Sequence, residues 1–229
     1  MDAPRVRVMD NGLGSMDLST ISPDHRPMVE TLGATQVEIL RGPATLLYGG
    51  GAIGGLVNVV TKRIPTDRLD GFFGAIEGRL GGADRQATGL IDLNGGNSSM
   101  SWHAGAFNRH TRDYRIKGPQ TPTDPASPVG VVRNSAVDAN GLNLGGTLFG
   151  SRGFIGVGVS TLASVYGVPS PESPRIDMHQ TRYDLSGELS DPLPGFTKAK
   201  LRMGRNQYAH DEIEATGAVS YTHLTLPTN

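Results

Sequence analysis

The chain has 229 residues, with 21 Lys plus Arg against 22 Asp plus Glu and a formal charge of −1. It therefore lacks the basic excess of a nucleic-acid-binding protein, and we expect no nucleic-acid partner. The absence of cysteine excludes disulfide scaffolds, thiol catalysis and cysteine-based zinc fingers. No segment approaches the ~18 consecutive apolar residues of a membrane-spanning helix. The N-terminus lacks a secretory signal pattern and begins with strand-like residues, so we expect a fragment of a longer protein.

The first 65 residues alternate short apolar runs with glycine turns. Residues 37–40 are predicted to form a strand, residues 41–43 a turn, and residues 44–48 a helical turn that ends at three glycines. A second strand is predicted over residues 52–61, interrupted by Gly54 and Gly55. A change of composition near Ile64 and Pro65 predicts the end of this first domain.

The remainder of the chain reads as strands whose side chains alternate between apolar and polar or small residues. Such period-two alternation is typical of β-strands, and it occurs in about seven segments. These segments cover residues 71–80, 87–94, 99–110, 140–149, 155–160, 182–190 and 199–203.

The connections between the predicted strands largely alternate in length. Residues 94–97, 150–153 and 191–195 are short turns, whereas residues 111–137 and 166–178 form longer loops. Short turns at one end and longer loops at the other are typical of bacterial outer-membrane barrels. A soluble β-sandwich would also show alternating strands, so this pattern alone leaves both architectures open.

The glycine-rich segment 49–55 also invites comparison with a phosphate-binding loop. A P-loop requires Lys followed by Ser or Thr directly after the glycines, but this chain has Leu56, Val57 and Asn58 there. A dinucleotide-binding fingerprint requires a following helix, whereas a β-branched strand follows here. Both observations disfavour a soluble nucleotide-binding protein. No Ser-His-Asp arrangement or paired carboxylates suggest a hydrolase, so we do not expect an enzyme.

Residues 37–60 read VEILRGPATLLYGGGAIGGLVNVV, and this segment closely resembles the plug domain of TonB-dependent outer-membrane receptors. The resemblance implies a mainly β protein, with an α/β plug domain followed by the first ~7 antiparallel strands of a truncated outer-membrane β-barrel. It implies an N-terminally truncated plug at residues 1–65 and a partial barrel at residues 66–219. Residues 220–229 break the strand pattern and are expected to be a non-native tail.

Residues 6–12 and 22–25, with residues 154–157 and 208–212, resemble the zinc-uptake branch of this family. Carried over by that resemblance, the metal ligands are Asp24 and His25 of the plug and Glu212 of a barrel strand. Zinc accepts imidazole nitrogen and carboxylate oxygen, usually with four ligands, so further ligands are needed. A histidine beyond this chain is expected among them. Zinc is thus the expected transported ligand, and no catalytic cofactor is expected.

The resemblance implies a monomeric receptor in the bacterial cell outer membrane that binds a metal ion between plug and barrel wall. TonB, with its inner-membrane energising complex, would then pull the plug to open a path. Arg41 is a candidate for contact between plug and barrel. Two alternatives remain: a TonB-dependent receptor for a siderophore or other metal chelate, and a passive porin-like or adhesin barrel. A plug has no role in the passive barrel.

Overall fold

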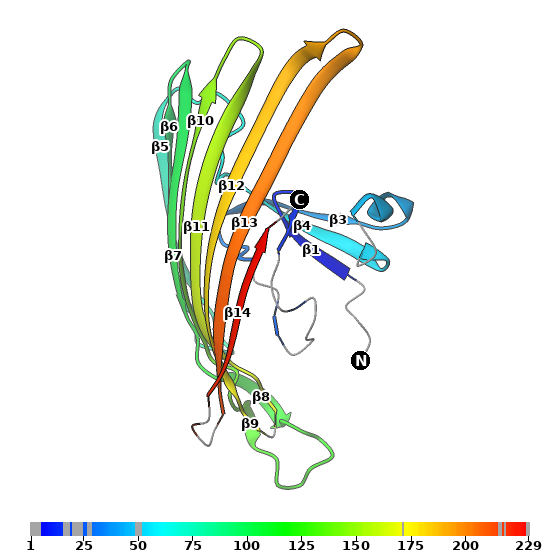
Figure 1. Cartoon of the computed structure of the whole chain (residues 1–229). Coiled ribbons are helices and arrows are strands. Elements are labelled where there is room, and N and C mark those ends of the chain that lie inside the picture. The colour runs from blue at the N-terminus through cyan, green and yellow to red at the C-terminus, as the bar shows by residue number, and fades with distance from the viewer. Residues whose placement is uncertain are drawn as a thin grey trace.

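The structure, a computed structural model, describes residues 6–15, 19, 25–26, 29–48, 52–170, 172–214, 217 and 219–227. Only the backbone is described at residues 44, 46, 47 and 219–227. Within these ranges, no helix has the length and apolar character needed to cross a membrane. The described residues form a small amino-terminal sheet, a large curved sheet and a separate hairpin (Figure 1).

The amino-terminal sheet has four strands in the order β2-β1-β4-β3. β1 runs parallel to β4, and β3 pairs antiparallel with the other edge of β4. The predicted helical turn is present as a 3-10 helix, η2, which leads from β3 toward β4. The elements are β1 (Val6–Asp10), β2 (Leu13–Gly14), β3 (Ala34–Leu40), η2 (Pro43–Tyr48) and β4 (Gly55–Thr61).

The large sheet has eight antiparallel strands in the order β14-β13-β12-β11-β10-β7-β6-β5. Its first seven strands correspond to the seven alternating segments, so the predicted mainly β fold is confirmed. The strands are β5 (Gly71–Leu80), β6 (Ala87–Gly96), β7 (Met100–His110), β10 (Val137–Phe149), β11 (Gly153–Gly167), β12 (Arg175–Leu193), β13 (Phe196–Ile213) and β14 (Val219–Pro227).

The structure differs from expectation in two segments. The long Pro-rich connection contains a short hairpin, β8 (Tyr114–Pro119) and β9 (Val129–Val132), whose irregular register hides a period-two pattern. The terminal segment, expected to stand outside the fold, pairs along β13 as β14. Antiparallel pairing uses backbone groups that any non-proline residue carries, so pairing does not require an alternating side-chain pattern.

The two ends of the large sheet are distinct. Short turns join β6 to β7, β10 to β11 and β12 to β13 at one end, which we call the turn end. The β8–β9 hairpin and the longer connections lie at the opposite end, which we call the loop end (Figure 1). The amino-terminal sheet lies on the concave side of the large sheet. We call the large sheet the wall.

The convex face of the large sheet changes character along each strand. Along β10, Leu144 and Leu148 are exposed toward the turn end, whereas exposed Asp138 and Asn140 follow toward the loop end. Neighbouring β11 continues the apolar half with exposed Ile155 and Val157, while the loop-end half of β12 exposes His179. An apolar band with polar ends is the pattern of a lipid-facing barrel surface.

Candidate functional site

A buried charge network joins the amino-terminal sheet to the wall. Asp10 ends β1, Arg63 follows β4, and Arg182 and Asp184 project from β12. Arg63 Nη2 lies 2.9 Å from Asp10 Oδ2 and 2.8 Å from Asp184 Oδ2. Arg182 Nε lies 2.9 Å from Asp184 Oδ1 and 3.7 Å from Asp10 Oδ2. Two arginines and two aspartates therefore balance one another in one cluster.

The opposite charges of the network compensate one another, although the network is buried. Both arginines are 4% exposed, so neither guanidinium relies on bulk water. Burial lowers the pKa of Arg63, but the carboxylates of Asp10 and Asp184 outweigh this effect and leave the pKa above its ordinary value. Removing one partner from such a cluster would leave a buried charge without compensation, which is strongly destabilising.

Residues 63–69, which we call the strap, connect the two sheets and lie directly on the wall. A Cβ atom at Gly145 would overlap the carbonyl oxygen of Arg63, and Cβ atoms at Gly156 and Gly158 would overlap the side chain of Ile64. Glycine is needed at these wall positions because the strap approaches the strands so closely. Thr147 Oγ1 donates to the carbonyl of Pro65 at 2.6 Å.

The rest of the strap is held through hydrogen bonds. Ser101 Oγ donates to the carbonyl of Asp67 at 3.0 Å and accepts from the amide of Leu69 at 2.9 Å. Arg68 reaches the turn end, where Nε donates to the Ser98 carbonyl at 2.9 Å and Nη2 to the Gly150 carbonyl at 2.7 Å. The strap is therefore attached to β7, β10 and the turns beside them.

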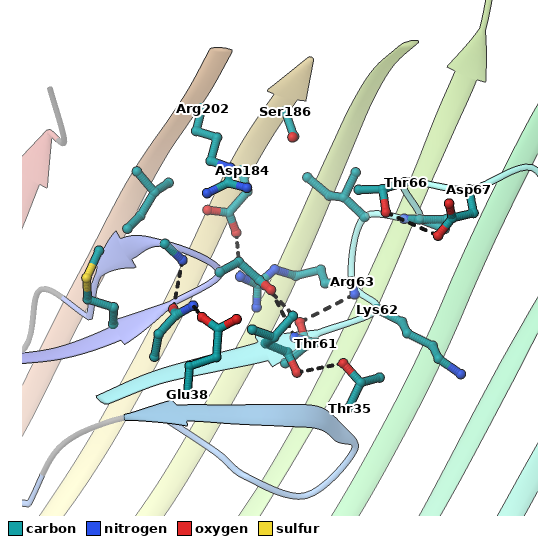
Figure 2. Close-up of a pocket in the computed structure, with 18 of the residues that line it drawn as sticks. Thr35, Glu38, Thr61, Lys62, Arg63, Thr66, Asp67, Asp184, Ser186 and Arg202 are labelled. Carbon is teal, nitrogen blue, oxygen red and sulfur yellow. Dashed lines mark hydrogen bonds and ion pairs between the residues drawn. The ribbon is translucent and has the colours of Figure 1, made fainter. Parts of the chain in front are cut away.

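A cavity of about 760 Å³ opens beside the strap, between the amino-terminal sheet and the wall. Figure 2 shows its lining, with Arg63 between the small sheet and Asp184 of the wall. Glu38 accepts from Asn58 Nδ2 at 2.8 Å, and Asn58 Oδ1 accepts from the Gly12 amide at 2.8 Å. These two polar side chains of the lining are therefore bonded to each other and to the backbone of the small sheet.

A second contact, between the connection from β2 to β3 and the wall, lies toward the loop end. We call His25, Arg26, Tyr166, Tyr208 and His210 the loop-end cluster. The rings of His25 and His210 meet edge to face with centroids 4.9 Å apart, and the Tyr208 ring lies 5.5 Å from that of His210. The Arg26 guanidinium lies 4.7 Å from the centre of the Tyr166 ring. The cluster thus combines cation–π and aromatic contacts.

The loop-end cluster rests on the core of the wall. Tyr166 and Tyr208 pack with Ile176 and Met178, and each of these four side chains is at most 4% exposed. Burial lowers the pKa of Arg26, and the nearby positive charge of Arg109 acts in the same direction. Arg109 itself pairs with Glu30 at 2.8 Å, which adds another ion pair between the two sheets.

The predicted site residues are only partly brought together. His25 is 7% exposed and contacts His210, a residue that the sequence did not single out as a ligand. Glu212 lies two residues further along β13, half-buried, and Asp24 lies outside the described residues. Within the described part of the chain, no group of three or more His, Asp or Glu side chains could hold a metal ion. The metal site at Asp24, His25 and Glu212 stays a prediction.

The sequence predicted a contact between Arg41 and the barrel, but it did not predict the charge network. Arg41 lies exposed after β3, and its contact with the barrel stays a prediction. The observed contacts between the sheets instead involve Arg63 and Arg182, which no motif marked. One usable signal was present: Arg182 and Asp184 fall on the same face of an alternating strand, where an inward pair of charges needs partners.

Comparison with known proteins identifies the amino-terminal unit. Residues 1–56 match the family described as TonB-dependent Receptor Plug Domain. The chain is 33% identical over 194 residues to the ferric enterobactin receptor PirA of Pseudomonas aeruginosa, covering 81% of this chain and 20% of that protein. It is 37% identical over 73 residues to the ferrienterobactin receptor of Escherichia coli K12, covering 31% of this chain and 9% of that one.

Solved structures share the fold at lower identity. The copper transporter OprC superposes with a TM-score of 0.70 at 15% identity, over 93% of this chain and 31% of that chain. The ferric enterobactin receptor PfeA of Pseudomonas aeruginosa in complex with enterobactin gives a TM-score of 0.68 at 14% identity, over 98% and 38%. The matched part of the chain covers between 9% and 38% of these longer proteins.

TonB-dependent receptors are outer-membrane proteins, so the match of residues 1–56 to their plug domain indicates an outer-membrane location. The apolar convex band agrees with that location. The zinc-uptake branch receives no support from these similarities, since the proteins reported above are named for enterobactin or copper. Residues 1–56 match the plug domain of TonB-dependent receptors, and the strands that follow share the fold of the solved structures named above.

Proposed function

We propose that this chain belongs to a TonB-dependent receptor that takes up a ferric siderophore. The observation that carries the proposal is the 33% identity to the ferric enterobactin receptor PirA over 81% of this chain. This proposal replaces zinc as the expected cargo, because the relatives that resemble the chain in sequence and are reported above are named for ferric enterobactin.

The chemistry of the loop-end cluster supports the same proposal. A ferric catecholate complex is anionic and aromatic, so it is suited to guanidinium groups and aromatic rings. The cluster supplies Arg26 and two tyrosines, with Arg109 nearby. Because Arg26 comes from the plug and stacks on Tyr166 of the wall, a ligand that binds the Arg26 guanidinium would act on the contact between plug and wall.

The test is uptake of radioactive iron supplied as ferric enterobactin. The full-length receptor is expressed in a bacterial strain that lacks its own receptors for this complex. We expect uptake above the empty-vector control, and we expect its loss when TonB is deleted. Uptake that persists without TonB would favour the passive porin-like barrel. No iron uptake by a receptor that is present in the outer membrane would contradict the siderophore proposal.

A metal ion is the second candidate cargo, favoured by the contact between His25 of the plug and His210 of the wall. Two imidazoles side by side are a plausible start for a zinc or copper site, with Asp24 and Glu212 nearby in sequence. Zinc titration of the full-length receptor and of its Asp24→Ala, His25→Ala double variant distinguishes the candidates. Equal zinc affinity of the two proteins would exclude this site as a zinc site.

A further inference from the structure

The strap and the charge network together indicate which part of the plug can move. When the plug moves, its moving part must separate from the wall without steric clashes and must break every contact with the part that stays. The point in the chain where the moving part ends therefore decides which residues of the charge network separate: Asp10, Arg63, Arg182 or Asp184. The inference rests on the proposed function only in assuming that the plug shifts relative to the wall.

Arg63 is attached to the wall through its backbone as well as its side chain. Its carbonyl oxygen fits against Gly145, and the Cγ of Arg63 would lie 3.0 Å from a Cβ at Gly158. Its Nη1 donates to Ser160 Oγ at 3.4 Å, and Nη2 pairs with Asp184 at 2.8 Å. The following Ile64 and Pro65 are also held by β10 and β11. Besides these contacts with the wall, Arg63 contacts the small sheet at Asp10 and at Thr61 of β4, whose Oγ1 accepts from the Arg63 amide at 3.4 Å.

Asp10 is placed differently. It belongs to β1, whose partners β2 and β4 are both strands of the small sheet. Its carboxylate contacts Arg63 at 2.9 Å and Arg182 at 3.7 Å, and both arginines are wall-bound. Arg182 Nη1 also donates to the carbonyl of Gly14 at 3.1 Å. Gly14 belongs to β2, the neighbour of β1 in the small sheet. The small sheet thus contributes one carboxylate to two arginines that are held by the wall.

We propose that the strap stays on the wall when the plug moves, and that Asp10 is the residue that latches the movable sheet. In this arrangement Asp184 keeps its contacts with both arginines when Asp10 leaves, and the wall is left with one positive charge in excess. Within the network, the contacts that opening breaks are those of Asp10 and Gly14 with the two arginines. Asp10 is a positioning residue: it touches no ligand and acts by holding β1 in place.

The test compares double variants that each remove one positive and one negative charge. Arg182→Gln with Asp184→Asn leaves the Asp10–Arg63 pair, which crosses the proposed boundary. Asp10→Asn with Arg182→Gln leaves the Arg63–Asp184 pair, which lies within the wall. Both variants keep the net charge and the same number of charged groups, so they are matched controls for each other.

Opening is measured by maleimide labelling of a cysteine placed at Ser15. Ser15 is 2% exposed and follows β2 on the movable sheet, so the label reacts only when the sheet leaves the wall. The full-length receptor, freed of any other cysteine, is reconstituted in lipid vesicles without siderophore or TonB. This readout needs no transport, so its outcome is independent of whether ferric enterobactin is the cargo.

We expect the variant that keeps Asp10–Arg63 to be labelled about tenfold more slowly than the variant that keeps Arg63–Asp184. Equal rates, or the reverse order, would overturn the proposal, and the reverse order would show that Arg63 travels with the plug. If a double variant fails to fold, single variants replace the pair. Asp10→Asn should then be labelled faster than Asp184→Asn, and the opposite order would again overturn the latch.

Discussion

The imidazole of His25 in the plug meets that of His210 in β13 edge to face, with ring centroids 4.9 Å apart. The contact is buried from both sides, since the two residues are 7% and 4% exposed. It is therefore the point at which the outer part of the plug is held against the wall of the barrel.

Replacement of His210 by Ala should weaken binding of ferric enterobactin to the full-length receptor. The change removes the surface against which His25 packs, so the neighbouring Arg26 loses its fixed position. We expect about a tenfold rise in the dissociation constant, equivalent to ~1.4 kcal/mol. His179 is the matched control because it lies on adjacent β12 but faces outward, with its side chain 70% exposed. A fluorescence titration in which His210→Ala and His179→Ala both match the wild type would contradict the expectation.

A single methyl group should distinguish two adjacent glycines of β10. Gly145 faces the strap, and a Cβ there would overlap the Arg63 carbonyl, whereas a Cβ at Gly146 would lie 3.8 Å from its nearest neighbour. Gly145→Ala should lower the free energy of unfolding by about 1–3 kcal/mol through overpacking. Gly146→Ala should be close to neutral. Thermal unfolding of the two variants measures the difference, and equal melting temperatures would show that the strap adapts without cost.

Truncation of Met178 should destabilise the wall. Its side chain is 0% exposed and packs with Tyr166, Ile176 and Tyr208 beneath the loop-end cluster. Met178→Ala should cost about 2–5 kcal/mol, as for other large-to-small core replacements. Met203→Ala, on the outward face of β13 with 51% exposure, is the control and should cost less. Urea unfolding in lipid vesicles gives both values; a similar loss for the two would count against a packed wall core.

An arginine scan of the outward face of β10 should locate the membrane boundary. Leu144 lies in the apolar band and Asn140 in the polar half, four residues closer to the loop end on the same face. Leu144→Arg should cost about 2–4 kcal/mol if that position lies near the middle of the bilayer. Asn140→Arg should be tolerated. Insertion of both variants with equal stability would mean that the apolar band does not face lipid.

The sequence allowed the seven wall strands to be predicted because each strand has one apolar and one polar or small face. The domain change near Ile64 and Pro65 also coincides with the start of the strap along the wall. The β8–β9 hairpin was missed since its strands are short and their register is irregular. Pairing of β14 with β13 was missed because backbone pairing leaves little trace in the composition of a strand.

Of the residues at the interface, only those within one short sequence motif could be singled out from the sequence. His25 stood out beside Asp24 in a polar segment; the structure shows it buried against His210, and its role as a metal ligand stays a prediction. Asp10 and Arg63 did not stand out, because each is an isolated charge in its own segment. Their significance comes from Arg182 and Asp184, which lie far away in sequence and meet them only after the sheet has curved around the plug.

The parallel pairing of β1 with β4 has a mechanical consequence. Val6 pairs with Gly55 and Asp10 with Val59, so the two strands point the same way over five residue pairs. Tension that enters before Val6 and is resisted by the strap after Thr61 would pull the strands in opposite directions along their length. The hydrogen bonds between them would then share the load in shear, instead of opening one after another like a zipper. Under such a pull, β1 and β4 should leave the wall together before they separate from each other.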